Sequence, residues 1–103
     1  MISTNKHIPK KIKQDILAKI CYTELVYTRI NKKLKTNFSN KQIETFIFKI
    51  LQETEKKYFS KKGKNFYITN IKNKITITIN ANTFRVITVD KIKDNPSIKT
   101  RIP

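Results

Sequence analysis

Residues 66–90 read FYITNIKNKITITINANTFRVITVD, and this stretch decides the fold. Apolar and polar side chains alternate along most of it, which is the period of half-buried β-strands. Three strands are predicted, namely Phe66–Ile71, Ile75–Asn80 and Thr83–Asp90. Lys72-Asn73 and Ala81-Asn82 separate them as plausible two-residue turns, because asparagine tolerates positive φ. The stretch therefore predicts a three-stranded antiparallel meander.

These turns set the register of the predicted sheet. Phe66 is expected opposite Ile79 and Ile68 opposite Ile77, and on the next strand Phe84 opposite Ile79 and Val86 opposite Ile77. These apolar side chains would share one face and cover the helices. The other face would carry Asn65, Tyr67, Thr69, Thr76, Thr78, Asn80, Thr83 and Arg85, with Ile87 and Val89 at one end. A slip of one residue in either hairpin would scatter this set.

Helical spacing of apolar residues precedes the strands, from about Lys10 to Lys35. One stripe contains Ile12, Ile16, Ile20, Tyr27, Ile30 and Leu34, and a second contains Leu17, Cys21 and Leu25. Two stripes predict either one helix contacted from two sides or two helices broken near Tyr22–Thr23, where β-branching weakens helix propensity. Within the second stripe Cys21 is expected to be a buried small hydrophobe, with a reactive thiol as the alternative.

A further helix is marked at its start by Ser39 and Gln42, which form an S-x-x-Q capping box, with Phe38 and Ile43 spaced as a hydrophobic staple. Its apolar stripe contains Ile43, Phe46, Ile47, Ile50 and Leu51. This helix should end near Lys57, and Gly63 marks the loop that follows. The predicted fold class is α+β, with two N-terminal helices on one face of the meander and the other face open and polar.

The chain of 103 residues has room for one core. Residues 1–9 are expected to be a flexible arm, 10–92 a single α+β domain, and 93–103 an irregular basic tail. No apolar run has the length of a secretory signal or a transmembrane helix, so a cytoplasmic protein without membrane insertion is expected.

Charge is the strongest compositional signal. Lys and Arg total 23 and Asp and Glu total 7, giving a net charge of +16. No acidic residue occurs from Lys56 to Val89, so positive charge is concentrated there as it is in proteins that bind polyanions. The alternative to polyanion binding is that the lysine content only reflects the codon usage of an AT-rich genome.

Several segments resemble one bacterial family. The run Cys21-Tyr22-Thr23-Glu24-Leu25-Val26-Tyr27-Thr28-Arg29-Ile30 is similar to its signature, as are Gly63-Lys64-Asn65-Phe66-Tyr67, Asn80-Ala81-Asn82-Thr83 and Arg85-Val86-Ile87-Thr88-Val89-Asp90. The family is catalogued as domain of unknown function 3781, and the resemblance covers about residues 10–92. It implies a shared fold and no activity. A looser fold-level resemblance is to small ribonuclease toxins of the barnase, colicin and RelE-like kind, whose open sheet face binds RNA.

Sites for metals and cofactors are not expected. His7 is the only histidine, Cys21 has no ligand partner at a suitable spacing, and a single glycine excludes phosphate-cradling loops. A metal-independent ribonuclease stays possible, with Arg85 stabilising the developing charge and Tyr67 or Glu24 handling protons. Glu24 falls between the two apolar stripes, where it could instead be the buried partner of an arginine.

The leading hypothesis is a nucleic-acid-binding domain, with RNA favoured over DNA, that uses the open sheet face. Tyr22, Arg29 and Lys33 are expected to share one face of the first helix and to extend the basic surface. The predicted binding residues are Lys61, Lys62, Lys64, Asn65, Tyr67, Thr78, Asn80, Arg85, Tyr22, Arg29 and Lys33. The alternatives are a ribonuclease toxin with an acidic antitoxin as partner, and a protein-interaction module or mobile-element inhibitor that binds an acidic protein.

Overall fold

The structure, a computed structural model, describes residues 10–92. The predicted arm 1–9 and tail 93–103 lie outside the described residues. Within them the elements are α1 (Lys10–Lys19), α2 (Glu24–Leu34), α3 (Asn40–Glu53), the 3₁₀ turn η2 (Lys56–Tyr58), β1 (Phe59–Lys62), β2 (Asn65–Asn70), β3 (Ile75–Asn80) and β4 (Val86–Lys91). The α+β class is confirmed, but this part of the chain has three α-helices and four strands where the sequence predicted two and three.

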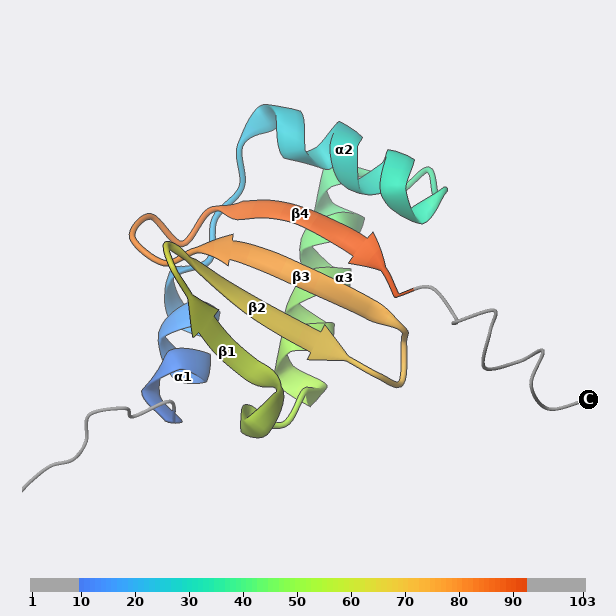
Figure 1. The fold of residues 1–103 in the computed structure, drawn as a ribbon. Helices are drawn as coiled ribbons and strands as arrows, with labels where there is room; N and C mark the ends of the chain where they lie inside the picture. Colours follow the sequence, from blue (N-terminus) through green and yellow to red (C-terminus); the bar gives the residue numbers. More distant parts are fainter. Residues whose placement is uncertain (1–9, 93–103) are drawn as a thin grey trace, which may run out of the picture.

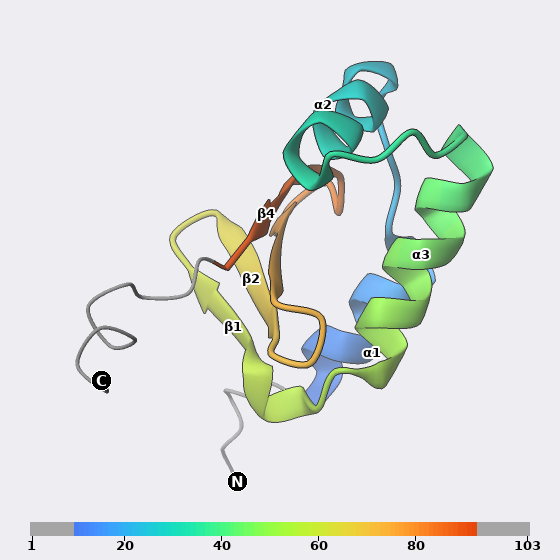
Figure 2. The ribbon, with the colours of Figure 1, turned by 90° about the vertical axis from the view of Figure 1, so that its right-hand side faces the viewer.

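The strands form one antiparallel sheet in the order β1-β2-β3-β4 (Figure 1). Figure 2, a side view, shows α1 and α3 on one face of the sheet and α2 along the β4 edge. No other described element covers the opposite face. We call this face the open face.

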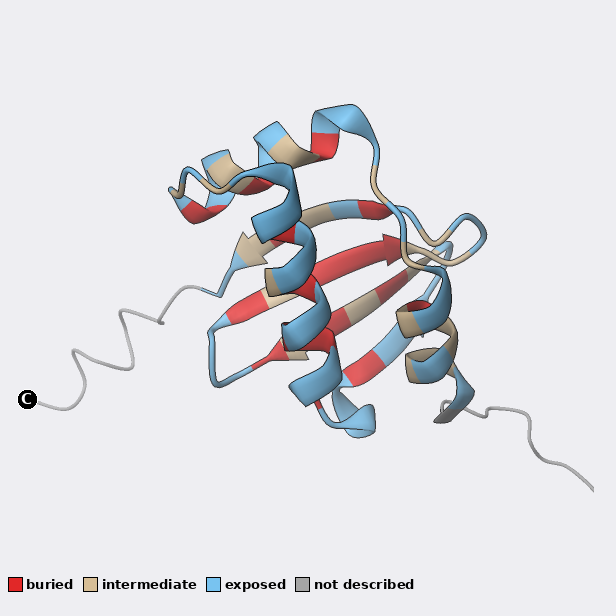
Figure 3. Cartoon of the chain, turned by 180° about the vertical axis from the view of Figure 1, so that it is seen from behind, coloured by how far each residue is buried: buried red, intermediate tan, exposed pale blue. Residues whose placement is uncertain are grey.

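The core lies between the sheet and the helices (Figure 3). Its side chains with no exposed surface are Ile16, Ile30, Ile43, Ile47, Leu51, Ile68, Ile77, Ile79 and Val89. Isoleucine suits both layers, because it packs well on a pleated sheet and presents a bulky apolar face from a helix. The predicted apolar stripe of α3 is confirmed at Ile43, Ile47, Ile50 and Leu51.

The N-terminal helical stretch is broken, which confirms the second of the two alternatives. α1 ends at Lys19, and Thr23 takes an extended conformation as the N-cap of α2. Between them Cys21 pairs with Arg85 in a parallel bridge. The predicted second apolar stripe is wrong, since Cys21 is exposed and Leu25 is 79% exposed. A linker that pairs with a strand cannot continue a helical face.

The capping box of α3 is confirmed. Ser39 Oγ accepts from the Gln42 amide at 3.1 Å, and Gln42 Oε1 accepts from the Ser39 amide at 2.8 Å. α3 ends at Glu53 rather than near Lys57, because Thr54 leaves the helical conformation at ψ 130°. Lys13 Nζ donates to the carbonyl oxygens of Gln52 (2.8 Å) and Thr54 (2.7 Å), so a cation satisfies the C-terminal end of the helix.

Strand β1 was not predicted. It pairs with β2 in a register that places Phe59 opposite Ile68 and Lys62 opposite Asn65. Gly63 makes the reversal between them at φ +61°, a conformation that costs glycine little. Only Phe59 of the four β1 residues is buried, so an apolar alternation was absent from the sequence.

The predicted register of β2 and β3 is confirmed, with Phe66 opposite Ile79 and Ile68 opposite Ile77. The turn between these strands is longer than predicted, because Asn70 pairs with Ile75 and four residues connect them. Asn70 Oδ1 accepts from the Asn73 amide at 2.8 Å, and Lys74 takes the positive φ that was expected of asparagine.

The predicted register of β3 and β4 is wrong. Ile79 pairs with Val86 instead of Phe84, and Ile77 pairs with Val89 instead of Val86, with a bulge at Thr78/Ile79. The extra residue of the bulge reverses which side chains of β4 face the core beyond it. Val89 is therefore buried in the core rather than on the open face.

Candidate nucleic-acid interface

The open face is polar along all four strands. The register places these side chains together: Ser60 and Lys62 of β1, Asn65, Tyr67 and Thr69 of β2, Thr76, Thr78 and Asn80 of β3, and Thr88 and Asp90 of β4. Hydroxyls and amides dominate the set, as the sequence predicted. Thr88 and Asp90 replace Ile87 and Val89 because of the bulge. Thr83 and Arg85, which were also predicted on this face, precede β4 and are not part of the register, so that part of the prediction is wrong.

Tyr67 is the aromatic residue of this face. It lies on β2 between Ser60 of β1 and Thr78 of β3, and its side chain is half-buried. Asn65 Nδ2 donates to the Tyr67 hydroxyl at 3.4 Å, a long and therefore weak hydrogen bond within the open face. Thr78 is only 8% exposed, so Tyr67 offers more accessible surface than its cross-strand neighbour.

The β1–β2 hairpin forms one cationic border of the open face. Lys61, Lys62 and Lys64 are all exposed. Lys62 pairs with Asn65 and so stands on the open face, whereas Lys61 pairs with Phe66 and its ammonium donates to the Gly63 carbonyl at 3.3 Å. The hairpin therefore presents lysines along the edge that flanks Tyr67.

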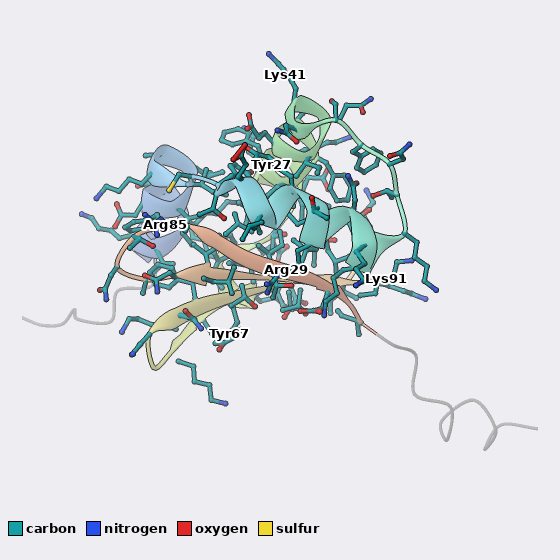
Figure 4. The ribbon with its side chains drawn as sticks, turned by 90° about the horizontal axis from the view of Figure 1, so that it is seen from above. Tyr27, Arg29, Lys41, Tyr67, Arg85 and Lys91 are labelled. Carbon is teal, nitrogen blue, oxygen red and sulfur yellow. The ribbon has the colours of Figure 1, made fainter. Side chains whose placement is uncertain are left out.

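Helix α2 forms the opposite border. Its core side carries Val26, Ile30 and Leu34. Arg29 and Lys33 are one turn apart on the same side of the helix. Figure 4, the view from above, shows Arg29 on the side of α2 nearer Tyr67. Lys33 reaches the open face, where its ammonium lies 2.7 Å from Asp90 Oδ1.

Asp90 is the acid of the open face. The sequence placed it at the end of the third predicted strand without a side-chain partner, and the bulge turns it outward beside Thr76. It is the only acidic residue on a strand within residues 10–92. Its ion pair with Lys33 neutralises this charge and leaves the rest of the described sheet layer basic or neutral.

Arg85 lies just before β4. The Cys21 amide donates to the Phe84 carbonyl and the Val86 amide to the Cys21 carbonyl, each at 3.0 Å, so the α1–α2 linker holds the backbone on both sides of Arg85. The Arg85 side chain is exposed and lines a hollow of about 280 Å³ between α2 and β4, together with Arg29. The two predicted arginines therefore line the same hollow, although they come from different elements.

Tyr22 does not join them. It stacks on Tyr27 with ring centroids 5.5 Å apart, and it lines a separate hollow against α3. Figure 4 shows Tyr27 on the far side of α2 from Tyr67, with Lys41 beyond it. The predicted grouping of Tyr22 with Arg29 and Lys33 is therefore wrong, because Tyr22 precedes α2 and does not share its face.

Glu44 of α3 completes the tyrosine pair. The Tyr27 hydroxyl donates to Glu44 Oε2 at 2.5 Å. Burial, followed by this hydrogen bond, raises the pKa of Tyr27 to about 12. Burial, followed by the negative charge of Glu44, also raises the pKa of Tyr22. Both rings stay neutral near pH 7, and they attach α2 and its linker to α3.

The three predicted catalytic residues are not brought together by contacts. Glu24 is exposed in the first turn of α2, so the alternative that it is the buried partner of an arginine is wrong. No hydrogen bond or ion pair within residues 10–92 joins Glu24, Tyr67 or Arg85 to another of the three. Their catalytic role stays a prediction.

The described residues contain neither a cluster of metal ligands nor a helix that could span a membrane. Within the described residues, no three His, Cys, Asp or Glu side chains gather as a metal site. None of the helices in this part of the chain is long and apolar enough to cross a membrane.

Among known proteins, the chain matches the sequence model of one family. The sequence model of a family described as "Protein of unknown function (DUF3781)" matches residues 14–90, which is most of the chain. No curated protein and no solved structure matches it. The match confirms the family resemblance seen in the sequence. The resemblance to ribonuclease toxins is not confirmed by it.

Proposed function

Since the chain belongs to the DUF3781 family, whose description assigns no activity, we propose from its own residues that it binds single-stranded nucleic acid on the open face, with RNA preferred. The observation that carries this proposal is the position of Tyr67. Its ring lies between two cationic borders, the lysines of the β1–β2 hairpin and the Arg29–Lys33 side of α2.

This arrangement fits the needs of a single strand. Unstacked bases can stack on an aromatic ring, which contributes about 1–3 kcal/mol per base, while cations along the path hold the phosphates. Lys62 and Lys64 could contact phosphates on one side of Tyr67, and Arg29 could do so on the other. A duplex keeps its bases stacked inside, so it would gain only the phosphate contacts.

Hydroxyl and amide groups support RNA as the preferred strand. Asn65, Thr69, Thr76 and Asn80 surround Tyr67 on β2 and β3 and are half-exposed. Such groups can donate to and accept from the ribose 2′-hydroxyl, which is both donor and acceptor and is absent from DNA. They can equally reach the exposed edges of bases that are no longer paired.

The charge arrangement favours one side of the molecule. Within residues 10–92 every acid except Asp90 lies on a helix or beside one, and Asp90 is paired with Lys33. α3 mixes its signs, since it carries Lys41 and Lys49 with Glu44 and Glu53. A polyanion would therefore meet less repulsion on the open face than on the helical side.

The test compares equal charge changes on the two sides. Labelled single-stranded RNA, the matching DNA and an RNA duplex are titrated at low salt by fluorescence anisotropy. The double variant Lys62→Gln/Lys64→Gln should weaken RNA binding, while Lys41→Gln/Lys49→Gln on α3, which removes the same charge, should leave affinity nearly unchanged. If both double variants lost the same affinity, binding would depend only on the net charge of the chain, and the proposal of a site on the open face would be wrong.

Tyr67 is tested separately. Tyr67→Ala should weaken RNA binding by about tenfold, while Tyr67→Phe keeps the ring and should stay close to the parent protein. Affinity that is unchanged in Tyr67→Ala, or no binding of any strand at low salt, would remove the proposal.

A further inference from the structure

The chain has few arginines, and two of them line the same hollow. Of 23 basic residues only Arg29, Arg85 and Arg101 are arginines, and the others are lysines. Arg29 of α2 and Arg85 before β4 line the same hollow of about 280 Å³. A composition that supplies lysine almost everywhere else gives no reason for two arginines to line one hollow.

Neither guanidinium has a partner among the described residues. Within residues 10–92, no ion pair or hydrogen bond engages the Arg29 or the Arg85 side chain, although Lys33 one turn along α2 is paired with Asp90. The walls between them include the apolar side chains of Leu25, Val86 and Ile87. Apolar walls strengthen the repulsion of like charges and equally strengthen their attraction for an anion.

Rigid elements fix the pair. Arg85 is held by the two backbone hydrogen bonds between the linker and the segment Phe84–Val86, and Arg29 sits in the middle of an eleven-residue helix. Thr23, the N-cap of α2, also lines the hollow, and its side chain makes no capping hydrogen bond. Its hydroxyl is therefore available as a third donor beside the two guanidinium groups.

We propose that this hollow binds the terminal phosphate of a nucleic-acid strand, an inference that rests on the proposed function. A phosphomonoester carries about −1.5 to −2 charges near neutral pH, whereas a phosphodiester within a strand carries one. Two guanidinium groups match the dianion in charge, and each can bind two of its oxygens through a planar fork. The lysines of the hairpin, as point charges, suit the phosphates inside the strand.

The position of the hollow agrees with this role. It lies beside the open face, since Arg29 is on the Tyr67 side of α2. A strand whose end phosphate sits between the arginines could pass its following nucleotides across β3 and β2 toward Tyr67 and the hairpin lysines. The arginines would then select strand ends, and the open face would bind the chain that follows.

The experiment compares strands that differ only at their ends. Labelled RNA of one sequence is prepared with a 5′-phosphate, with a 3′-phosphate and with hydroxyls at both ends. We expect one phosphorylated form to bind about tenfold more tightly than the hydroxyl form. Arg29→Lys and Arg85→Lys keep the charge but lose the fork, so each should abolish most of that preference. The control Lys62→Gln/Lys64→Gln should weaken all three strands equally.

The outcomes separate the two proposals. Equal binding of the three strands, or a preference that survives in both arginine variants, overturns the terminal-phosphate site and leaves the open-face proposal standing. If no strand binds, the proposed function fails. In that case the hollow is tested by itself with uridine 5′-monophosphate and, as the control, uridine. If the hollow binds a phosphomonoester, the monophosphate alone should change the NMR chemical shifts of backbone amides in α2 and at the start of β4.

Discussion

Asp90 is the residue where charge on the open face can be tested most simply. Its carboxylate and the Lys33 ammonium are both about half exposed, at 43% and 49%, so their ion pair contributes little to stability. Its effect on a bound polyanion is larger, because it occupies Lys33 and repels phosphate. The sequence could not show this, since only the bulge in β4 turns Asp90 toward the open face.

Asp90→Asn should therefore strengthen RNA binding by about two- to fivefold at low salt, with the free energy of unfolding changed by less than about 0.5 kcal/mol. Anisotropy titrations and urea denaturation measure the two effects. Lys33→Gln is the matched variant and should weaken binding instead. A weaker complex for Asp90→Asn would show that the carboxylate contacts the ligand favourably.

Tyr22 and Tyr27 make stability depend on alkaline pH. Their folded pKa values are raised above the ordinary value of about 10, to about 12 for Tyr27. The unfolded chain therefore loses these protons first, so the stabilisation is complete below about pH 10 and is lost as the pH rises toward 12. The urea midpoint should fall between about pH 8 and about pH 11.

Tyr27→Phe removes one of the two groups and should make that fall smaller. The variant also loses the hydrogen bond to Glu44, so a lower midpoint at pH 8 is expected as well. The slope between the two pH values is the decisive measurement. A slope equal to that of the parent protein would show that Tyr27 ionises alike in the folded and unfolded chains.

Among the helices and strands, those marked by signals within a short segment of sequence were the easiest to predict. Ser39 and Gln42 are three residues apart, and both hydrogen bonds of their capping box depend only on that segment. Ser39→Ala should therefore destabilise the protein by about 1 kcal/mol in urea denaturation. Ser60→Ala on the exposed strand β1 is the control and should change stability by less than about 0.5 kcal/mol. Equal effects would mean that the cap makes no specific contribution.

The alternation of β2 and β3 predicted their register, because one wrong step would have buried threonine and exposed isoleucine. The register of β4 was harder to predict. Asn80 Oδ1 accepts from the amides of Asn82 and Thr83, and Phe84 takes a positive φ of 61°, so the connection to β4 is longer than two residues. Neither this loop nor the bulge can be recognised from the alternation of apolar and polar residues in the sequence.

Two elements were hidden from the sequence for other reasons. β1 contains Ser60, Lys61 and Lys62, which carry no apolar period, and its place depends on Phe59 packing in the core of the finished fold. The break between α1 and α2 depends on the pairing of Cys21 with Arg85, residues 64 positions apart. Of the candidate site, Tyr67 and the hairpin lysines were therefore predictable, whereas the shared hollow of Arg29 and Arg85 was not.

The described part of the molecule distributes its acids unevenly between its layers. The chain carries +16 over 103 residues, yet in the described range the acids other than Asp90 lie on helices or beside one, and among them only Glu24 is on α2, at the border of the open face. Self-repulsion of this size opposes folding, and a bound polyanion relieves it. Binding of RNA should therefore depend on salt through the cations of one side, not through the net charge of the chain.

This separation predicts how affinity responds to salt. For a single strand the slope of log K against log salt is about −0.7 per phosphate charge neutralised. A strand with two charges held by Lys62 and Lys64 and the two charges of its terminal phosphate held by Arg29 and Arg85 should therefore give a slope of about −3. The variant Lys62→Gln/Lys64→Gln should reduce its magnitude by about 1.4. Lys41→Gln/Lys49→Gln lowers the net charge equally and should leave the slope unchanged, since α3 lies behind the sheet. A slope that followed net charge alone would contradict a binding surface on the open face, because counterions are released only where phosphates contact the protein.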